Sequence, residues 1–193
     1  MALTLLLGGA RSGKSALAVR LAGRSAGPVT VVVTGQARDA EMAERIRRHR
    51  AERPGHWRTV EAPCELEAAL AGAPADAFVV LDCLTLWVSN LMERGLDDRR
   101  VAELARSAAA VAAARAAPTV AVSNEVGAGI VPADALSRRY RDLLGEVNAV
   151  WAAEADQALL LVAGRAVPTG GQPLGQGRLS AAGAAEQQGQ RHQ

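Results

Sequence analysis

Residues 3–15 read LTLLLGGARSGKS, an apolar run that leads directly into the pattern G-x-x-x-x-G-K-S. Glycine lets the backbone bend so that successive N–H groups point at phosphate oxygens, and the following helix adds the partial positive charge of its N-terminus. A strand before this pattern and a helix after it predict a loop that binds a nucleoside triphosphate, although a glycine-rich turn could match by chance. The loop comprises Gly8, Gly9, Ala10, Arg11, Ser12, Gly13, Lys14 and Ser15.

Lys14 is the only lysine of the chain, since the other 21 of its 22 Lys+Arg residues are arginine. Its ammonium can reach the β- and γ-phosphates, and the hydroxyl of Ser15 can ligate Mg²⁺. A carboxylate at the end of a neighbouring strand usually orients that metal, and Asp82 ends the apolar run FVVL. Asp82 could instead cap the helix that follows. Glu125, which follows another apolar run, is a second acid whose role the sequence leaves open.

Short apolar runs alternate with longer helical stretches over most of the chain. This alternation predicts an α/β, P-loop NTPase-like fold with three layers and a mainly parallel sheet, because strands covered on both faces are nearly all apolar. The predicted strands are Leu3–Leu7, Val29–Val33, Ala77–Leu81, Thr119–Ser123 and Gln157–Val162, with Arg58–Val60 as an edge strand. The predicted helices are Lys14–Ala22, Ala40–Arg53, Glu65–Ala71, Leu84–Glu93, Asp98–Ala117 and Asp134–Ala155.

The 193 residues suit one domain, which we place at residues 1–166. Residues 167–193 are rich in Gly, Gln, Ala and Ser without an apolar period, so we expect a disordered tail without chemistry. The net charge of +2 does not favour a nucleic-acid partner. Two cysteines without a second pair favour neither a zinc site nor a disulfide framework, which indicates the cytoplasm. No apolar run approaches the roughly 20 residues of a membrane span.

The segment Ala40–Arg53 combines five arginines with one histidine, His49. On a helix, Arg45, His49 and Arg53 lie on roughly one face. This pattern suits a solvated basic face with an incidental histidine. It also suits a triphosphate site, because arginine forks match phosphate oxygens and crowded like charges repel one another unless an anion is bound. The same positive field disfavours imidazolium, and a neutral His49 is the form that can attack phosphorus.

Several segments together make the chain similar to the bifunctional adenosylcobinamide kinase/adenosylcobinamide-phosphate guanylyltransferase family of cobalamin biosynthesis. The resemblance covers about residues 3–165 and is far more specific than the phosphate-binding loop alone. Its segments are Gly8–Ser15 (GGARSGKS), Glu41–Glu61 (EMAERIRRHRAERPGHWRTVE), Asp82–Asn90 (DCLTLWVSN), Val122–Pro132 (VSNEVGAGIVP) and Leu136–Asn148 (LSRRYRDLLGEVN).

The resemblance implies a role for individual residues. His49 would be the residue that becomes guanylylated and, with Lys14, would be catalytic, whereas Ser15 and Asp82 are candidates for holding Mg²⁺ on the pattern of the loop and its neighbouring strand. Some relatives carry a second histidine beside the nucleophile, where this chain has Arg48. Besides the loop, the residues implied to bind the nucleotide are Thr34, Gly35, Gln36, Arg50, Ala51, Glu52, Arg53, Glu61 and Asp82. The family also implies a homo-oligomer.

Two reactions on one acceptor would follow. ATP or GTP would phosphorylate adenosylcobinamide, and GMP from GTP would then pass through His49 to the cobinamide phosphate, giving adenosylcobinamide-GDP. Either the nucleotide or the His49 helix would have to reposition between the two steps. The nearest alternative is a P-loop small-molecule or nucleoside monophosphate kinase without a covalent intermediate. A switch GTPase is excluded, because its Asn-Lys-x-Asp motif needs a second lysine. A motor or transport ATPase is disfavoured, because such proteins usually carry two adjacent acids after this strand, whereas Asp82 is followed by Cys83.

Overall fold

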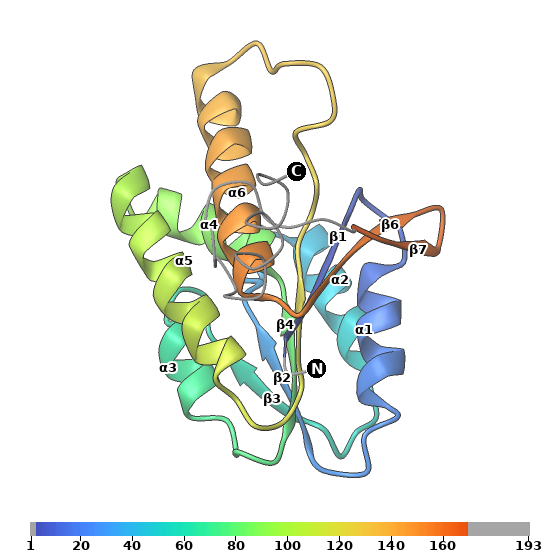
Figure 1. Ribbon diagram of the computed structural model, residues 1–193. Coiled ribbons are helices and arrows are strands. Elements are labelled where there is room, and N and C mark those ends of the chain that lie inside the picture. The colour runs from blue at the N-terminus through green and yellow to red at the C-terminus, as the bar shows by residue number, and fades with distance from the viewer. Residues whose placement is uncertain (1–2, 170–193) are drawn as a thin grey trace, which may run out of the picture.

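The computed structural model describes residues 3–169, which form one seven-stranded sheet in the order β3-β2-β4-β5-β1-β6-β7 (Figure 1). The strands are β1 (Leu3–Gly8), β2 (Val29–Val33), β3 (Arg58–Glu61), β4 (Phe78–Asp82), β5 (Thr119–Val122), β6 (Gln157–Val162) and β7 (Arg165–Pro168). The helices are α1 (Lys14–Ala22), α2 (Ala40–Ala51), α3 (Leu66–Ala71), α4 (Leu84–Glu93), α5 (Asp98–Ala113) and α6 (Ala135–Glu154).

All neighbouring strands from β3 to β6 pair in parallel, and only β7 is antiparallel to its neighbour. The carboxyl ends of the six parallel strands therefore meet at one edge of the sheet, where α/β proteins bind their ligands. This confirms the predicted α/β fold with a mainly parallel sheet, including the predicted edge strand, which is β3.

Two hydrophobic clusters lie on opposite faces of the sheet. The larger cluster joins the sheet to α3, α4, α5 and α6, and it contains the buried Trp87 and Trp151. The smaller cluster packs α1 against the other face through Ala18 and Ala22. The three-layer arrangement is thereby confirmed (Figure 1). None of the helices among residues 3–169 is long and apolar enough to cross a membrane.

Local chemistry explains most of the helix boundaries. Asp39, Asp97 and Asp134 each accept a hydrogen bond from the backbone N–H three residues later, so each caps the start of its helix. The structure ends α5 at Ala113, four residues before the predicted end. Pro118 disfavours helical backbone just before it, and the Arg115 guanidinium instead donates to four carbonyl oxygens of residues 70–77.

Strand β7 is not among the strands predicted from the sequence. Ala163 and Gly164 both have positive φ, at 49° and 77°, and form a two-residue turn that returns the chain along β6. Val167 and Pro168 belong to this strand, so assigning the tail to residues 167–193 placed its start too early. The remainder of that tail, from residue 170 onward, lies outside the described residues.

Candidate active site

The phosphate-binding loop connects β1 to α1, and two of its glycines have conformations that other residues rarely adopt. Gly8 has φ +150°, and a Cβ there would lie 2.4 Å from the carbonyl oxygen of Leu161 in β6. Gly13 has φ +97° and is the left-handed N-cap of α1. The turn before β7 braces the same loop, because the N–H of Gly164 donates to the Ser12 carbonyl oxygen at 3.1 Å.

Lys14 is held within this loop and is only 7% exposed. Its Nζ donates to the carbonyl oxygens of Gly8 (2.8 Å) and Gly9 (2.7 Å) and to Ser12 Oγ (3.3 Å). Burial is the main cause that lowers the pKa of the Lys14 ammonium. The single lysine of the chain is therefore fixed at the N-terminus of α1, where phosphate oxygens bind in loops of this kind.

A cavity of about 760 Å³ lies against this loop, the carboxyl edge of the sheet and α2. It brings together most of the residues predicted to bind the nucleotide and His49, the predicted nucleophile. These are Ala10, Arg11, Ser12, Gly13, Lys14, Ser15, Gly35, Gln36, His49, Arg50, Glu52, Arg53, Glu61 and Asp82.

The remaining predicted residues, Gly8, Gly9, Thr34 and Ala51, do not line the cavity. Gly8 and Gly9 contribute through their carbonyl oxygens, which bind Lys14. Thr34 is buried, and its hydroxyl donates to the Cys83 carbonyl oxygen at 2.6 Å while accepting from the Cys83 N–H at 3.0 Å. It joins the ends of β2 and β4 and is structural in this geometry.

The side chain of Asn90 in α4 holds the segment after β2 in place. The Asn90 amide donates to the carbonyl oxygens of Thr34 (2.8 Å) and Pro63 (2.9 Å), and its oxygen accepts from Arg38 at 2.9 Å. The Arg38 guanidinium also binds the side chain of Gln36. These contacts hold residues 34–38 in place, and Gly35, Gln36 and Ala37 of this segment line the cavity.

Asp82 contacts two residues of the arginine-rich segment. Its Oδ2 accepts a hydrogen bond from Arg53 Nη2 at 3.0 Å and lies 3.6 Å from His49 Nδ1. Burial by itself raises the pKa of the Asp82 carboxyl, but the contacts with His49 and Arg53 outweigh it, so the pKa lies below its ordinary value. The alternative role of Asp82 as a helix cap is wrong, because Cys83 is the N-cap of α4 and no side chain caps this helix.

The donor chemistry of the cavity suits a magnesium ion that is bound together with phosphate groups. Ser15 and Asp82 line the same cavity and offer hydroxyl and carboxylate oxygens, which Mg²⁺ prefers. Within residues 3–169, no group of three or more His, Cys, Asp or Glu side chains is placed to hold a metal ion by itself. A magnesium ion of this class needs only one or two protein ligands, because the phosphates and water supply the rest.

Asn124 lines the cavity, and sequence reasoning did not single it out. It follows β5, and its N–H donates to Thr85 Oγ1 at 2.8 Å, so its place at the carboxyl edge of a parallel strand was the available signal. Glu125 is not among the lining residues. Its backbone N–H donates to the Gly8 carbonyl oxygen, and its carboxylate accepts from the N–H of Gly127.

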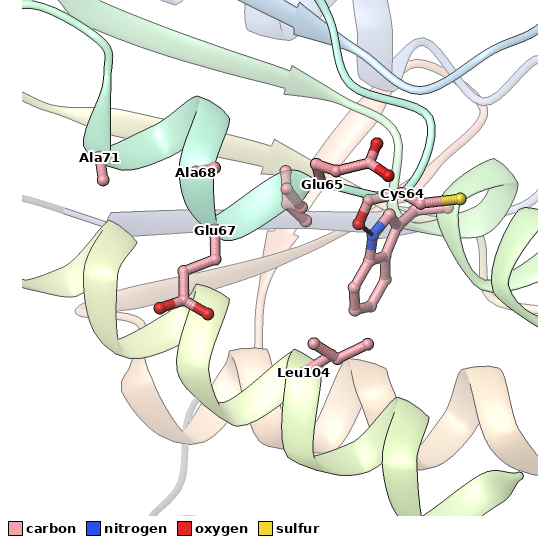
Figure 2. A pocket seen from close by; sticks show the side chains of 8 residues that line it. Cys64, Glu65, Glu67, Ala68, Ala71 and Leu104 are labelled. Carbon is pink, nitrogen blue, oxygen red and sulfur yellow. Dashed lines mark hydrogen bonds between the residues drawn. The ribbon is translucent and has the colours of Figure 1, made fainter. Parts of the chain in front are cut away.

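A second, smaller cavity of about 300 Å³ lies between α3 and α5 (Figure 2). Trp87 forms part of its wall and donates from Nε1 to the Cys64 carbonyl oxygen at 2.9 Å. None of the residues predicted to bind nucleotide or metal lines this cavity.

Comparison with known proteins agrees with this geometry. Residues 4–169 match the family model described as "Cobinamide kinase / cobinamide phosphate guanyltransferase". The chain is 44% identical to a bifunctional adenosylcobalamin biosynthesis protein, CobP, of Pseudomonas aeruginosa, over 88% of this chain and 98% of the relative. It is 41% and 42% identical to the corresponding CobU proteins of Salmonella typhimurium and Escherichia coli, in each case over 83% of this chain and 95% of the relative.

Among solved structures, an ATPase of a bacterial type III secretion system aligns with 83% of this chain and 51% of its own, with a TM-score of 0.47 and 12% identity. That likeness is too weak to add to the fold described above. The match over residues 4–169 and the identities above 40% are decisive. This chain belongs to the cobinamide kinase / cobinamide phosphate guanyltransferase family of transferases.

Proposed function

We propose that one nucleotide site serves both activities of this family, with His49 as the covalent carrier of GMP. The observation that carries the proposal is that the phosphate-binding loop and His49 line one cavity of about 760 Å³. The substrates would be ATP or GTP and adenosylcobinamide in the first reaction, and GTP and adenosylcobinamide phosphate in the second. Family membership alone would be equally compatible with two separate nucleotide sites.

In the kinase reaction, a hydroxyl oxygen of the acceptor attacks the γ-phosphorus as the bond from that phosphorus to the leaving nucleoside diphosphate breaks, and the hydroxyl proton is released to water. Lys14 and the N–H groups of residues 8–15 bind the phosphate oxygens and stabilise the charge that shifts onto the leaving group. Ser15 and Asp82 are the residues that would hold Mg²⁺, which neutralises phosphate charge when bound. The chain therefore contributes positioning and electrostatic stabilisation rather than a covalent step.

In the guanylyl transfer, a ring nitrogen of His49 attacks the α-phosphorus of GTP and pyrophosphate leaves. A phosphate oxygen of the acceptor then attacks the same phosphorus, the nitrogen–phosphorus bond breaks, and His49 is regenerated. The covalent intermediate divides one difficult displacement into two easier ones. Arg45, Arg48 and Arg50 line the cavity beside His49 and supply positive charge for the phosphate oxygens.

Incubation with GTP and Mg²⁺ tests the covalent step. The intact mass of the protein should increase by one GMP, and the adduct should survive alkali and be lost in acid, as a phosphoramidate is. Peptide mapping should place it on His49, and His49→Ala should form none while keeping phosphorylation of the acceptor. If active wild-type protein forms no adduct, the covalent mechanism is wrong and the alternative kinase without a covalent intermediate is favoured.

We also infer a homo-oligomer whose contacts include the segment between β5 and α6, which extends beyond the end of the sheet in Figure 1. Ile130 on this segment is 97% exposed, and Val131 and Leu136 are exposed beside it. Grouped exposed apolar side chains indicate a binding surface. Sedimentation should show an oligomer that Ile130→Asp dissociates, and a monomeric wild type would contradict the inference.

Cys64 and Cys83 are both free thiols, which supports a reducing compartment such as the cytoplasm.

A further inference from the structure

The contact between β4 and the end of α2 converges on a single carboxylate oxygen. Asp82 Oδ2 takes both the hydrogen bond from Arg53 and the approach of His49 Nδ1. The side chains of Asp82 and Arg53 are only 12% and 9% exposed, whereas that of His49 is 31% exposed. The carboxylate is thus held between β4 and the chain after α2, and the imidazole lies at the solvent side of the pair.

This geometry distinguishes the two nitrogens of His49. A neutral imidazole carries one N–H and one lone pair, and the group that the N–H contacts decides which nitrogen holds the proton. A carboxylate only accepts, so Asp82 favours a proton on Nδ1 and leaves the lone pair on Nε2. The Nδ1–Oδ2 separation of 3.6 Å is longer than a formed hydrogen bond, as is common for catalytic contacts before the substrate binds.

We propose that Asp82 is a positioning residue, fixed by Arg53, that holds His49 in the tautomer protonated on Nδ1 so that Nε2 attacks the α-phosphorus. This inference rests on the proposed guanylyl-histidine. Orienting the ring of His49 is a role for the Asp82–Arg53 pair in addition to any binding of nucleotide or metal by Asp82.

The electron and proton balance of the step agrees with this role. The Nε2 lone pair forms the new bond to phosphorus, and the pair of the broken phosphorus–oxygen bond leaves with pyrophosphate. The proton stays on Nδ1, so no separate base is needed and the positive charge that develops on the ring faces the Asp82 carboxylate. When the acceptor phosphate attacks, the nitrogen–phosphorus pair returns to Nε2.

The helix that carries His49 makes such a contact necessary. No residue of α2 is fully buried, so side-chain packing does little to fix the orientation of the ring. Ile46 reaches the side of the cavity near Gly35 and Leu86, one turn before His49. At the other end Arg53 binds Asp82. The ring of His49 lies between these two attachments, and Asp82 is the charged group that contacts it.

Ring-nitrogen NMR of protein labelled with ¹⁵N-histidine tests the tautomer without any turnover. The chain has three histidines, so the spectrum is simple, and His49→Gln assigns the signals. At about pH 8, where an ordinary imidazole is neutral, wild-type His49 should show a protonated Nδ1 and an unprotonated Nε2. In Asp82→Asn the amide can donate to Nδ1, so the proton should move to Nε2. Glu44→Gln, which removes a carboxylate paired with Arg47, should leave the tautomer unchanged.

Single-turnover formation of the GMP adduct provides the second readout. Asp82→Asn should lower the rate constant at saturating GTP by about 10²-fold or more, as expected when the wrong tautomer dominates. The GTP concentration for half-maximal rate, measured at saturating Mg²⁺ because Asp82 is also proposed to hold the metal, should change by less than about threefold, far below one tenfold step in affinity. The ¹H–¹⁵N amide spectrum of the variant confirms that it is folded.

Two results would overturn the inference. One is a tautomer that Asp82→Asn does not change. The other is a rate constant at saturation that stays at the wild-type value while more GTP or Mg²⁺ is needed, which would make Asp82 a nucleotide or metal ligand only. A wild-type protein that shows the Nδ1–H tautomer but forms no adduct would overturn the covalent mechanism instead. The failure of the two proposals is therefore distinguishable.

Discussion

The phosphate-binding loop and α2 line the same cavity but are held in opposite ways. The loop is fixed by backbone geometry, with Gly8 and Gly13 in conformations that favour glycine and Lys14 buried against carbonyl oxygens. Helix α2 buries no residue completely, and Arg53 attaches the chain just after it through one buried ion pair. The difference suggests a division of labour in which the loop binds the triphosphate in both reactions and α2 supplies the group used in one.

Lys14→Ala should have the largest effect on activity. If it spared either activity, the loop would not bind the triphosphate in both reactions. Both reactions need a bound triphosphate, so we expect a loss on the order of 10³-fold in phosphorylation and in adduct formation. Steady-state assays measure the loss of phosphorylation, and intact-mass spectrometry of the protein measures the loss of the GMP adduct. Lys14→Arg should rescue neither, because a guanidinium cannot replace the slim ammonium between the loop carbonyls.

Gly8→Ala tests whether the loop is as rigid as its geometry indicates. Its Cβ would lie 2.4 Å from a backbone oxygen of β6 at a φ of +150°, so we expect the free energy of unfolding to fall by about 2–4 kcal/mol. Gly9→Ala is the matched control, since a Cβ there meets no atom within 4 Å and should cost less than about 1 kcal/mol. Chemical denaturation measures both. Equal costs would mean that the loop adjusts to the added atom.

Arg53→Gln weakens the attachment of α2 and should lower the free energy of unfolding by about 1–3 kcal/mol at pH 7. Because the folded pKa of Asp82 lies below its ordinary value, the contribution of its carboxylate is complete above about pH 5 and is lost as pH falls through the folded pKa. The difference between wild type and variant should therefore shrink on acidification. Denaturation at several pH values measures it.

Arg94→Gln serves as the control for that experiment. Arg94 pairs with Glu65 on the surface, with both side chains more than half exposed, so its loss should change the free energy of unfolding far less than the loss of Arg53. If the difference between wild type and Arg53→Gln stayed constant from pH 7 to pH 3, the buried pair with Asp82 would not be what Arg53 contributes.

The smallest expected effect concerns the exposed arginines of α2. Arg45→Gln or Arg48→Gln should weaken GTP binding about threefold to tenfold at low salt, and less at high salt, because both line the cavity but remain exposed. Arg47→Gln is the control, since Arg47 pairs with Glu44 and does not line the cavity. Titration with a fluorescent GTP analogue at two salt concentrations measures the difference. If Arg47→Gln weakened GTP binding equally, the arginines of α2 would act through the overall positive charge of the helix rather than through contacts with the nucleotide.

Much of the site could be predicted because its signals are local. The phosphate-binding loop, its flanking strand and helix, and the helical placement of His49 all depend on residues close together in the chain. β7 was missed because its turn uses Ala163 at positive φ, a conformation that alanine seldom adopts. Asn124 was missed because an asparagine after a strand has no local feature that separates a cavity wall from a turn.

The sequence by itself determined the strand–loop–helix unit around Lys14, because its glycines and apolar residues specify their conformation over a short range. It also determined a parallel α/β fold through alternating apolar runs. The tertiary structure alone decided that Asp82 meets Arg53 and His49. That contact joins segments about 30 residues apart, and it depends on how β4 and the α2 segment pack around the cavity. These polar side chains come together only in the folded chain, which removes most of the water around Asp82 and Arg53 and leaves His49 partly exposed beside them.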